Sequence, residues 1–183
     1  MRTFSILSWL AISLFFLTTS PHIEVVQAKG EPCQGGYSDR FCLTGKVENC
    51  RKYSLADLQQ YPTSSQITVS YYSGKEGLVT KTYIGVPLMD LLNDAVIITD
   101  PTRKNDRLRK YVVVRATDCY EVVLSLAELV SDFGHQQVLV AFATGDGQPL
   151  DDKEGMARLI VPGDKSGGRS VSNISMIKVR SAP

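Results

Sequence analysis

The chain begins with a short apolar run of the kind that directs export. Arg2 supplies a positive charge, and residues 4–17 form an apolar run of 14 residues before the polarity rises at Thr18. A membrane-spanning helix needs roughly 20 apolar residues, so this run is short for an anchor, and no later segment approaches that length. We therefore predict that residues 1–28 are a signal peptide cleaved after Ala28, with an uncleaved anchor as the alternative. The remainder is expected to be periplasmic or secreted and to have no membrane span.

Cleavage after residue 28 leaves 155 of the 183 residues, which suits one domain with its own hydrophobic core. Residues 29–40 are rich in glycine and polar side chains and are predicted to form an N-terminal arm, followed by the domain at residues 41–183. Cleavage removes Arg2 and Glu24 from totals of 20 basic and 19 acidic residues, so the net charge stays at +1. This balance argues against nucleic acid or an acidic membrane surface as the main partner.

The expected mature chain contains all four cysteines of the sequence, which are Cys33, Cys42, Cys50 and Cys119. In an oxidising compartment they allow three fully paired connectivities, and we expect at least one disulfide. A Cys33–Cys42 bond would hold down the arm and is the favoured pairing. Cys119 is then expected to pair with Cys50 or to be an inert thiol, because no positively charged neighbour in sequence would lower its pKa. A zinc site has little support, since no pair has C-x-x-C spacing.

The residue pattern predicts many short strands and a few short helices. The expected strands are residues 41–47, 67–72, 78–84, 111–115, 120–124, 137–143, 157–161 and 174–180. Two [ST]-x-x-[DE] sequences, at Ser54 and Ser125, predict helix starts, and Pro87 is expected near the start of another helix. Residues 100–110 are predicted to be a solvated polar loop. Because helices and strands do not alternate regularly, we predict an α+β fold with a mixed β-sheet.

Well-known catalytic motifs find little support in this chain. His135 has no nucleophile motif nearby and is interpreted as a loop residue. Residues 163–169 are rich in glycine but lack the G-x-x-x-x-G-K-[ST] order of a phosphate-binding loop. Amides freed by glycine, with Lys165, Arg169 and Arg158 close in sequence, predict a site for an anionic group. A mobile hairpin with a solvated basic rim is an equally open interpretation.

Several motifs follow one another in a specific order. They are GKVEN at 45–49 with YSLADL at 53–58, YIGVPLMDLL at 83–92, DCY at 118–120, GQPL at 147–150 and EGMARLIVPG at 154–163. Together they resemble the sulfite oxidase fold family, also called the oxidoreductase molybdopterin-binding domain, over most of residues 43–180. The resemblance implies a mixed α+β domain. Catalytic members of that family bind a molybdenum pterin cofactor and oxidise or reduce small substrates such as sulfite or sulfoxides.

The chain departs from this family where the resemblance places the cofactor. In catalytic relatives the strand that here ends near Tyr72 ends in a cysteine whose thiolate binds molybdenum, and a phenol is a harder and less acidic ligand. Glu154 replaces a histidine and Ser172 replaces a lysine, two groups that favour the anionic phosphate and the pterin. Cys119 stands where relatives usually have glycine, whereas Arg158 is kept.

These residues define one expected binding cleft, formed by Tyr72, Asp118, Cys119, Tyr120, Arg158 and Arg169. We interpret the protein as a binding module for a small anionic or pterin-like ligand, or for a partner protein, with no metal and no assigned catalytic residue. No cofactor is expected, although the resemblance leaves molybdopterin open. The main alternative is a true molybdopterin-dependent oxidoreductase with an atypical ligand set. A thiol-redox role for Cys119 and a purely structural interaction domain are further alternatives.

Overall fold

A computed structural model describes residues 33–183, so the predicted signal peptide and the first part of the arm lie outside the described residues. The strands are β1 (Arg40–Gly45), β2 (Arg51–Ser54), β3 (Ser65–Ser73), β4 (Gly77–Pro87), β5 (Lys110–Ala116), β6 (Glu121–Ser125), β7 (Leu139–Thr144), β8 (Arg158–Ile160) and β9 (Ile174–Ser181). The α-helices are α1 (Leu55–Gln59), α2 (Leu88–Ala95) and α3 (Leu126–Leu129), and the 3-10 turns are η1 (Asp106–Arg109) and η2 (Gly167–Arg169). In this part of the chain, every helix is too short or too polar to cross a membrane.

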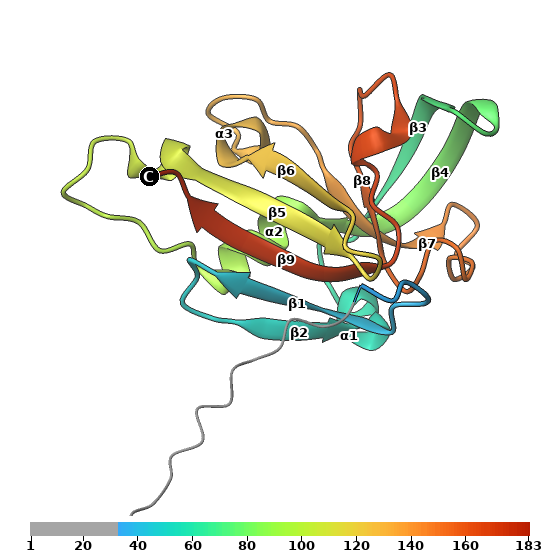
Figure 1. Ribbon diagram of the computed structural model, residues 1–183, viewed down its shortest axis with the longest axis horizontal. Coiled ribbons are helices and arrows are strands. Elements are labelled where there is room, and N and C mark those ends of the chain that lie inside the picture. Colours follow the sequence, from blue (N-terminus) through green and yellow to red (C-terminus); the bar gives the residue numbers. More distant parts are fainter. Residues whose placement is uncertain (1–32) are drawn as a thin grey trace, which may run out of the picture. The chain divides into compact units, whose positions relative to one another are not determined.

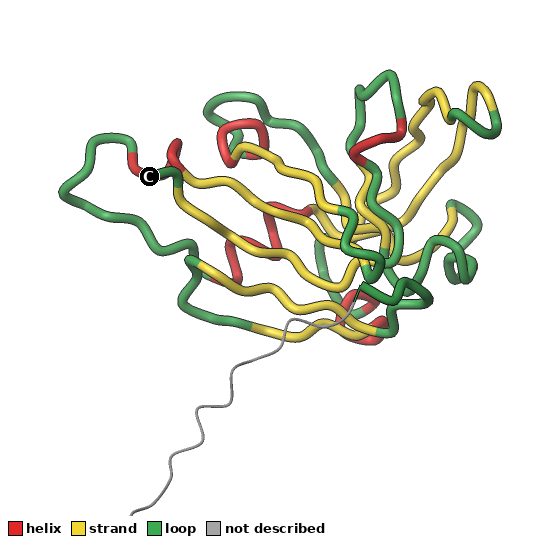
Figure 2. Tube along the Cα trace, viewed as in Figure 1, coloured by secondary structure: helices red, strands yellow, loops and turns green. Residues whose placement is uncertain are grey.

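The strands form two sheets (Figure 1). The larger sheet has the order β2-β1-β9-β5-β6, in which β1 and β9 are parallel and the other neighbours are antiparallel. The smaller sheet is antiparallel in the order β3-β4-β7-β8. Figure 2 shows how little of the chain is helical beside these strands. The predicted α+β class with mixed sheet pairing is confirmed.

One continuous core lies between the larger sheet, helix α2 and the inner residues of β4 and β7. It includes fully buried Leu43 and Val114 of the larger sheet, Leu91 of α2, and Val140 of β7. A second, smaller cluster is built on the β3–β4 hairpin around Tyr71 and Tyr83. The second cluster lies next to the side chains that form the candidate site, so the packing there fixes their positions.

Both predicted helix starts are confirmed. Ser54 and Ser125 each accept a hydrogen bond from a backbone N–H of the following turn, and the acidic residue three positions on bonds back to the serine N–H. The strand expected at 137–143 is β7, and it is buried on both faces as predicted. Pro87 lies directly before α2 and so does not interrupt its hydrogen bonds.

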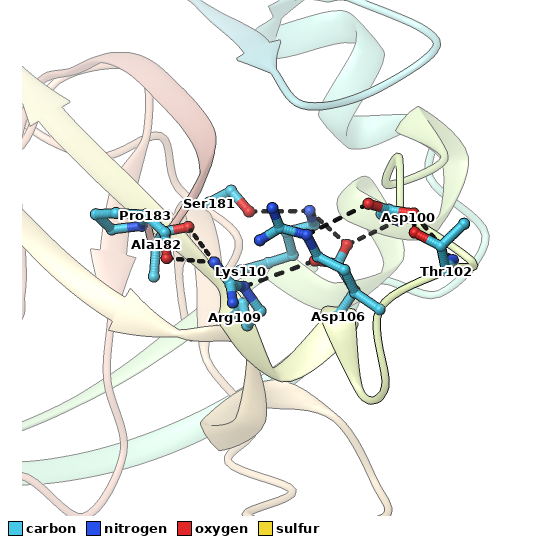
Figure 3. Close-up of polar contacts among 9 residues, drawn as sticks. Asp100, Thr102, Asp106, Arg109, Lys110, Ser181, Ala182 and Pro183 are labelled. Carbon is cyan, nitrogen blue, oxygen red and sulfur yellow. Dashed lines mark hydrogen bonds and ion pairs between the residues drawn. The ribbon is translucent and has the colours of Figure 1, made fainter.

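The prediction of a solvated loop at 100–110 is wrong for its last residues. Asp106 and Lys110 are buried and form an ion pair, with 2.7 Å between Oδ2 and Nζ (Figure 3). The Asp106 carboxylate also accepts from the Asp100 N–H, and Lys110 donates to Ser181 at 3.0 Å. A count of polar residues cannot distinguish this arrangement from a solvated loop, because the buried charges satisfy each other.

Candidate functional site

A cavity of about 520 Å³ lies beside the end of the β3–β4 hairpin. It is lined by residues of the hairpin, of segment 151–158 and of the loop containing η2, including Tyr71, Tyr72, Lys75, Lys81, Lys153, Glu154, Arg158, Ser166 and Ser172. The hairpin and the η2 loop lie side by side in Figure 1, and a β-bridge joins Tyr72 to Ser166. The structure therefore brings two of the expected site residues, Tyr72 and Arg158, to one cavity.

Tyr72 stands on the rim of this cavity. Its backbone N–H donates to the Lys165 carbonyl at 2.9 Å, which attaches the hairpin to the η2 loop. Side chains alternate along β3, so Tyr71 is buried while the Tyr72 ring is 64% exposed. At the position where the family resemblance predicts a metal-binding thiolate, this chain presents an accessible aromatic ring.

The floor of the cavity contains a buried ion pair. The Glu154 carboxylate lies 2.5 Å from Arg158 Nη1, and the Tyr83 hydroxyl donates to the same carboxylate oxygen at 2.9 Å. Arg158 Nη2 donates to the Tyr71 hydroxyl at 3.3 Å, and Lys81 Nζ lies 3.7 Å from Glu154. Burial, together with the nearby Glu154 carboxylate, raises the pKa of Tyr83, so the phenol stays protonated as a donor. Glu154 thereby neutralises the one family arginine that the chain retains.

The backbone around Glu154 is fixed by a tight turn. The Asp151 carboxylate accepts from the Glu154 N–H at 2.9 Å, and the Glu154 carbonyl accepts from the Asn173 N–H at 2.8 Å. Gly155 has a φ of +81°, and a Cβ there would lie 2.4 Å from Asn173 Oδ1. A glycine is therefore needed directly after Glu154, which explains the Glu-Gly pair noticed in the sequence.

Asp118 and Tyr120 line a neighbouring cavity of about 350 Å³. Lys153 and Ser172 line both cavities, so the two are adjacent. The Tyr120 hydroxyl donates to the Gly168 carbonyl at 2.6 Å, and its N–H donates to the Asp118 carboxylate at 2.9 Å. The first of these bonds holds the β5–β6 turn against the η2 loop, and the second lies within the turn.

Cys119 forms a disulfide with Cys33, with 5.1 Å between the two Cα atoms. The favoured Cys33–Cys42 pairing is therefore wrong, and so are the two states expected for Cys119. Within residues 33–183, Cys42 and Cys50 are free thiols. The reason is the path of the arm, which runs along the β5–β6 turn, where the Gly35 N–H donates to the Thr117 carbonyl, instead of folding back on β1.

Two features of Cys119 were not visible in the sequence. Its φ is +68°, a left-handed conformation that suits the glycine usual at this place in relatives. Arg115, four residues earlier and across the turn, donates from Nη2 to Cys119 Sγ. The expectation that no positive charge is near this sulfur holds only for its immediate neighbours in sequence, because hairpin pairing brings Arg115 to it.

Arg169 lies apart from Arg158 and is already paired. Its guanidinium binds both oxygens of Asp164, at 2.8 and 2.6 Å, and contacts Glu128 at 2.9 Å. Hydrogen bonding to Asp164 raises the pKa of Arg169, and both carboxylates favour its charge. It lines a third cavity with Tyr120 and Lys165. His135 lines a separate groove with residues of β3 and α2.

The groups of the first cavity that sequence reasoning missed include Tyr71, Lys81 and Lys153. The alternation of β3 was available as a signal for Tyr71, because a strand that exposes residue 72 turns residue 71 inward. The two lysines approach only through tertiary folding, and no local motif marks them.

The fold combines two mostly antiparallel sheets with few helices and has a polar cavity at the end of a hairpin. This arrangement agrees with the α+β domain that the family resemblance implies. Residues 37–183 match the profile of the oxidoreductase molybdopterin binding domain, and the chain belongs to this sulfite-oxidase-like family. A similar fold is found in the crystal structure of the sulfane dehydrogenase SoxCD from Paracoccus pantotrophus, with a TM-score of 0.60 and 23% identity. The similarity covers 76% of this chain and 37% of that chain. A search of curated proteins finds no match.

The residues present do not fit the metal end of a molybdenum pterin cofactor. Tyr72 offers a phenol where the family resemblance predicts a soft thiolate, and neither free cysteine lines the cavity beside it. The Glu154 carboxylate adds a negative charge beside Arg158, where the family resemblance predicts a histidine. The largely buried arginine of the cavity is therefore already paired with a carboxylate.

Proposed function

We propose that this chain is a ligand-binding member of the molybdopterin-binding family that carries out no molybdenum redox chemistry. One observation carries the proposal: the metal-ligand position holds the exposed phenol of Tyr72 on the rim of a polar cavity. We also propose, from the apolar run at residues 4–17, that the domain works in the periplasm or outside the cell.

The lining groups indicate the chemistry of the ligand. Three ammonium groups line the cavity, those of Lys75, Lys81 and Lys153. Apart from the buried Glu154–Arg158 pair, the lining contains two carboxylates, those of Glu76 and Asp151. The exposed Tyr72 ring offers a flat surface on which a heterocycle stacks. A small pterin-like ring that carries an anionic group satisfies both features, with the anion on the lysines and the ring on Tyr72.

Metal and pterin analysis tests the absence of molybdenum chemistry. We expect protein isolated from its native compartment to contain far less than one molybdenum per chain, because no thiolate is placed to bind it. Molybdenum is measured by plasma mass spectrometry and pterin by fluorescence after oxidation. A catalytic family member produced in the same cells serves as the control for cofactor supply. Stoichiometric molybdenum in this protein would contradict the proposal.

Titration calorimetry with 6-carboxypterin tests the ligand class. We expect Lys153→Gln and Tyr72→Ala each to weaken binding about tenfold, which corresponds to about 1.4 kcal/mol, because each removes one contact. Lys104→Gln, at an exposed position of the 100–110 loop, is the matched control and should leave the affinity unchanged. No binding by the unaltered protein, or equal binding by all variants, would overturn the pterin-like ligand and favour a partner protein.

A further inference from the structure

The Cys33–Cys119 disulfide is accessible from solvent. Cys33 is exposed and Cys119 is half-buried, at the turn between β5 and β6. An attacking thiolate must reach one sulfur along the S–S axis, and a bridge enclosed in a core prevents that approach. Cys33 is the more exposed partner here, so its sulfur is the expected point of attack, with Cys119 as the leaving group.

The leaving sulfur has a cationic partner. Arg115 Nη2 donates to Cys119 Sγ and lies 3.5 Å from Cys33 Sγ. A guanidinium beside a cysteine favours the thiolate over the thiol, and a more stable thiolate leaves faster. Two carboxylates oppose this effect: Glu121, 3.6 Å from Arg115 Nε, and Asp118, adjacent in sequence.

We propose that Cys33–Cys119 is a redox-active disulfide that exchanges with a dithiol reductant. The reductant's thiolate attacks Cys33 Sγ, the S–S bond breaks, and Cys119 leaves as a thiolate beside Arg115. The second thiol of the reductant then displaces Cys33 from the mixed disulfide. The protein gains two electrons and two protons as two thiols, and the dithiol is oxidised to a disulfide.

Reduction also frees one wall of a cavity. Gly35 and Gly36 line the cavity of Asp118 and Tyr120, where the Thr117 hydroxyl donates to the Gly36 carbonyl at 2.7 Å. Further along, Ser38 is held independently, since its N–H donates to Asn173 and its carbonyl accepts from the Met156 N–H. Once the disulfide is broken, residues 33–36 are held by the hydrogen bonds of Gly35 and Gly36 to Thr117, whereas Ser38 keeps its own contacts. We expect the two bonds at this exposed end of the chain to be too weak to keep residues 33–36 in place. The exchange itself does not depend on which ligand the cavities bind.

The equilibrium with glutathione tests the exchange on the whole oxidised chain, with each cysteine followed by alkylation and peptide mass spectrometry. We expect Arg115→Gln to disfavour reduction about tenfold, equivalent to about 30 mV for this two-electron couple, and to slow reduction by dithiothreitol. Arg115→Lys keeps a positive charge and should retain most of the effect. Arg103→Gln removes an exposed arginine elsewhere and should change nothing.

A second variant keeps the test decisive if Arg115→Gln folds poorly. Glu121→Gln removes the competing carboxylate, so it should favour reduction, opposite in sign to Arg115→Gln. Hydrogen exchange should show that the Gly35 amide loses its protection on reduction while the Ser38 amide keeps it. Reduction only as fast as global unfolding, no opposite shift for Glu121→Gln, or a Gly35 amide still protected after reduction would overturn the proposal.

Discussion

Replacing Glu154 with glutamine is expected to lower the free energy of unfolding by about 3 kcal/mol. The change leaves the largely buried Arg158 guanidinium without its carboxylate, and removing one partner of a buried ion pair costs more than the intact pair contributes. The same change frees a cation at the cavity, so inorganic phosphate should bind about tenfold more tightly. Urea unfolding followed by circular dichroism measures the first effect, and titration calorimetry measures the second.

Glu76→Gln is the matched control for this prediction. Glu76 lines the same cavity but is exposed and forms no ion pair within the described residues, so its stability change should stay within about 0.5 kcal/mol. Replacing both partners, as Glu154→Leu with Arg158→Met, should recover much of the loss, because no buried charge is then left alone. Unchanged stability together with unchanged phosphate affinity for Glu154→Gln would show that Glu154 does not neutralise Arg158.

Local signals in the sequence were enough to predict most of the elements. Ser54 and Ser125 mark helix starts because a capping box is formed within four residues, and β7 is recognised because a strand buried on both faces is nearly all apolar. Such features depend on neighbours in sequence. The family resemblance added the place of Tyr72 in the expected cleft, which local patterns do not supply.

Long-range contacts account for what the sequence did not show. Cys33 and Cys119 are separated by 86 positions, and the pairing depends on the path of the arm. The Glu154–Arg158 pair is close in sequence, but its burial comes from Tyr71 and Tyr83 of the β3–β4 hairpin. Pairing and burial of charges are tertiary properties, so a list of charged residues predicts neither.

Breaking the buried Asp106–Lys110 ion pair is the second change for which we expect a large loss of stability. We expect Asp106→Asn to lower the melting temperature by roughly 10 °C at pH 7, because a buried ammonium loses its carboxylate. Asp106 also caps the 100–110 loop through the Asp100 N–H, and Lys110 begins β5 beside Ser181 of β9 (Figure 3). The variant therefore loosens the loop and the end of the larger sheet together. Thermal unfolding followed by circular dichroism measures the change.

The stability difference between wild type and Asp106→Asn should depend on pH, whereas a difference caused by lost packing should not. The hydrogen bond from Lys110 and the bond from the Asp100 N–H lower the pKa of Asp106 in the folded protein. Its stabilisation is therefore complete above the unfolded value of about 3.9 and is lost as the pH falls through the lower folded pKa. The difference between wild type and Asp106→Asn should shrink below about pH 4. Arg103→Gln, which removes an exposed ion pair from the same loop, should have little effect at any pH. An Asp106→Asn difference that persists unchanged at pH 2 would mean that lost packing, and not the charge of Asp106, causes the destabilisation.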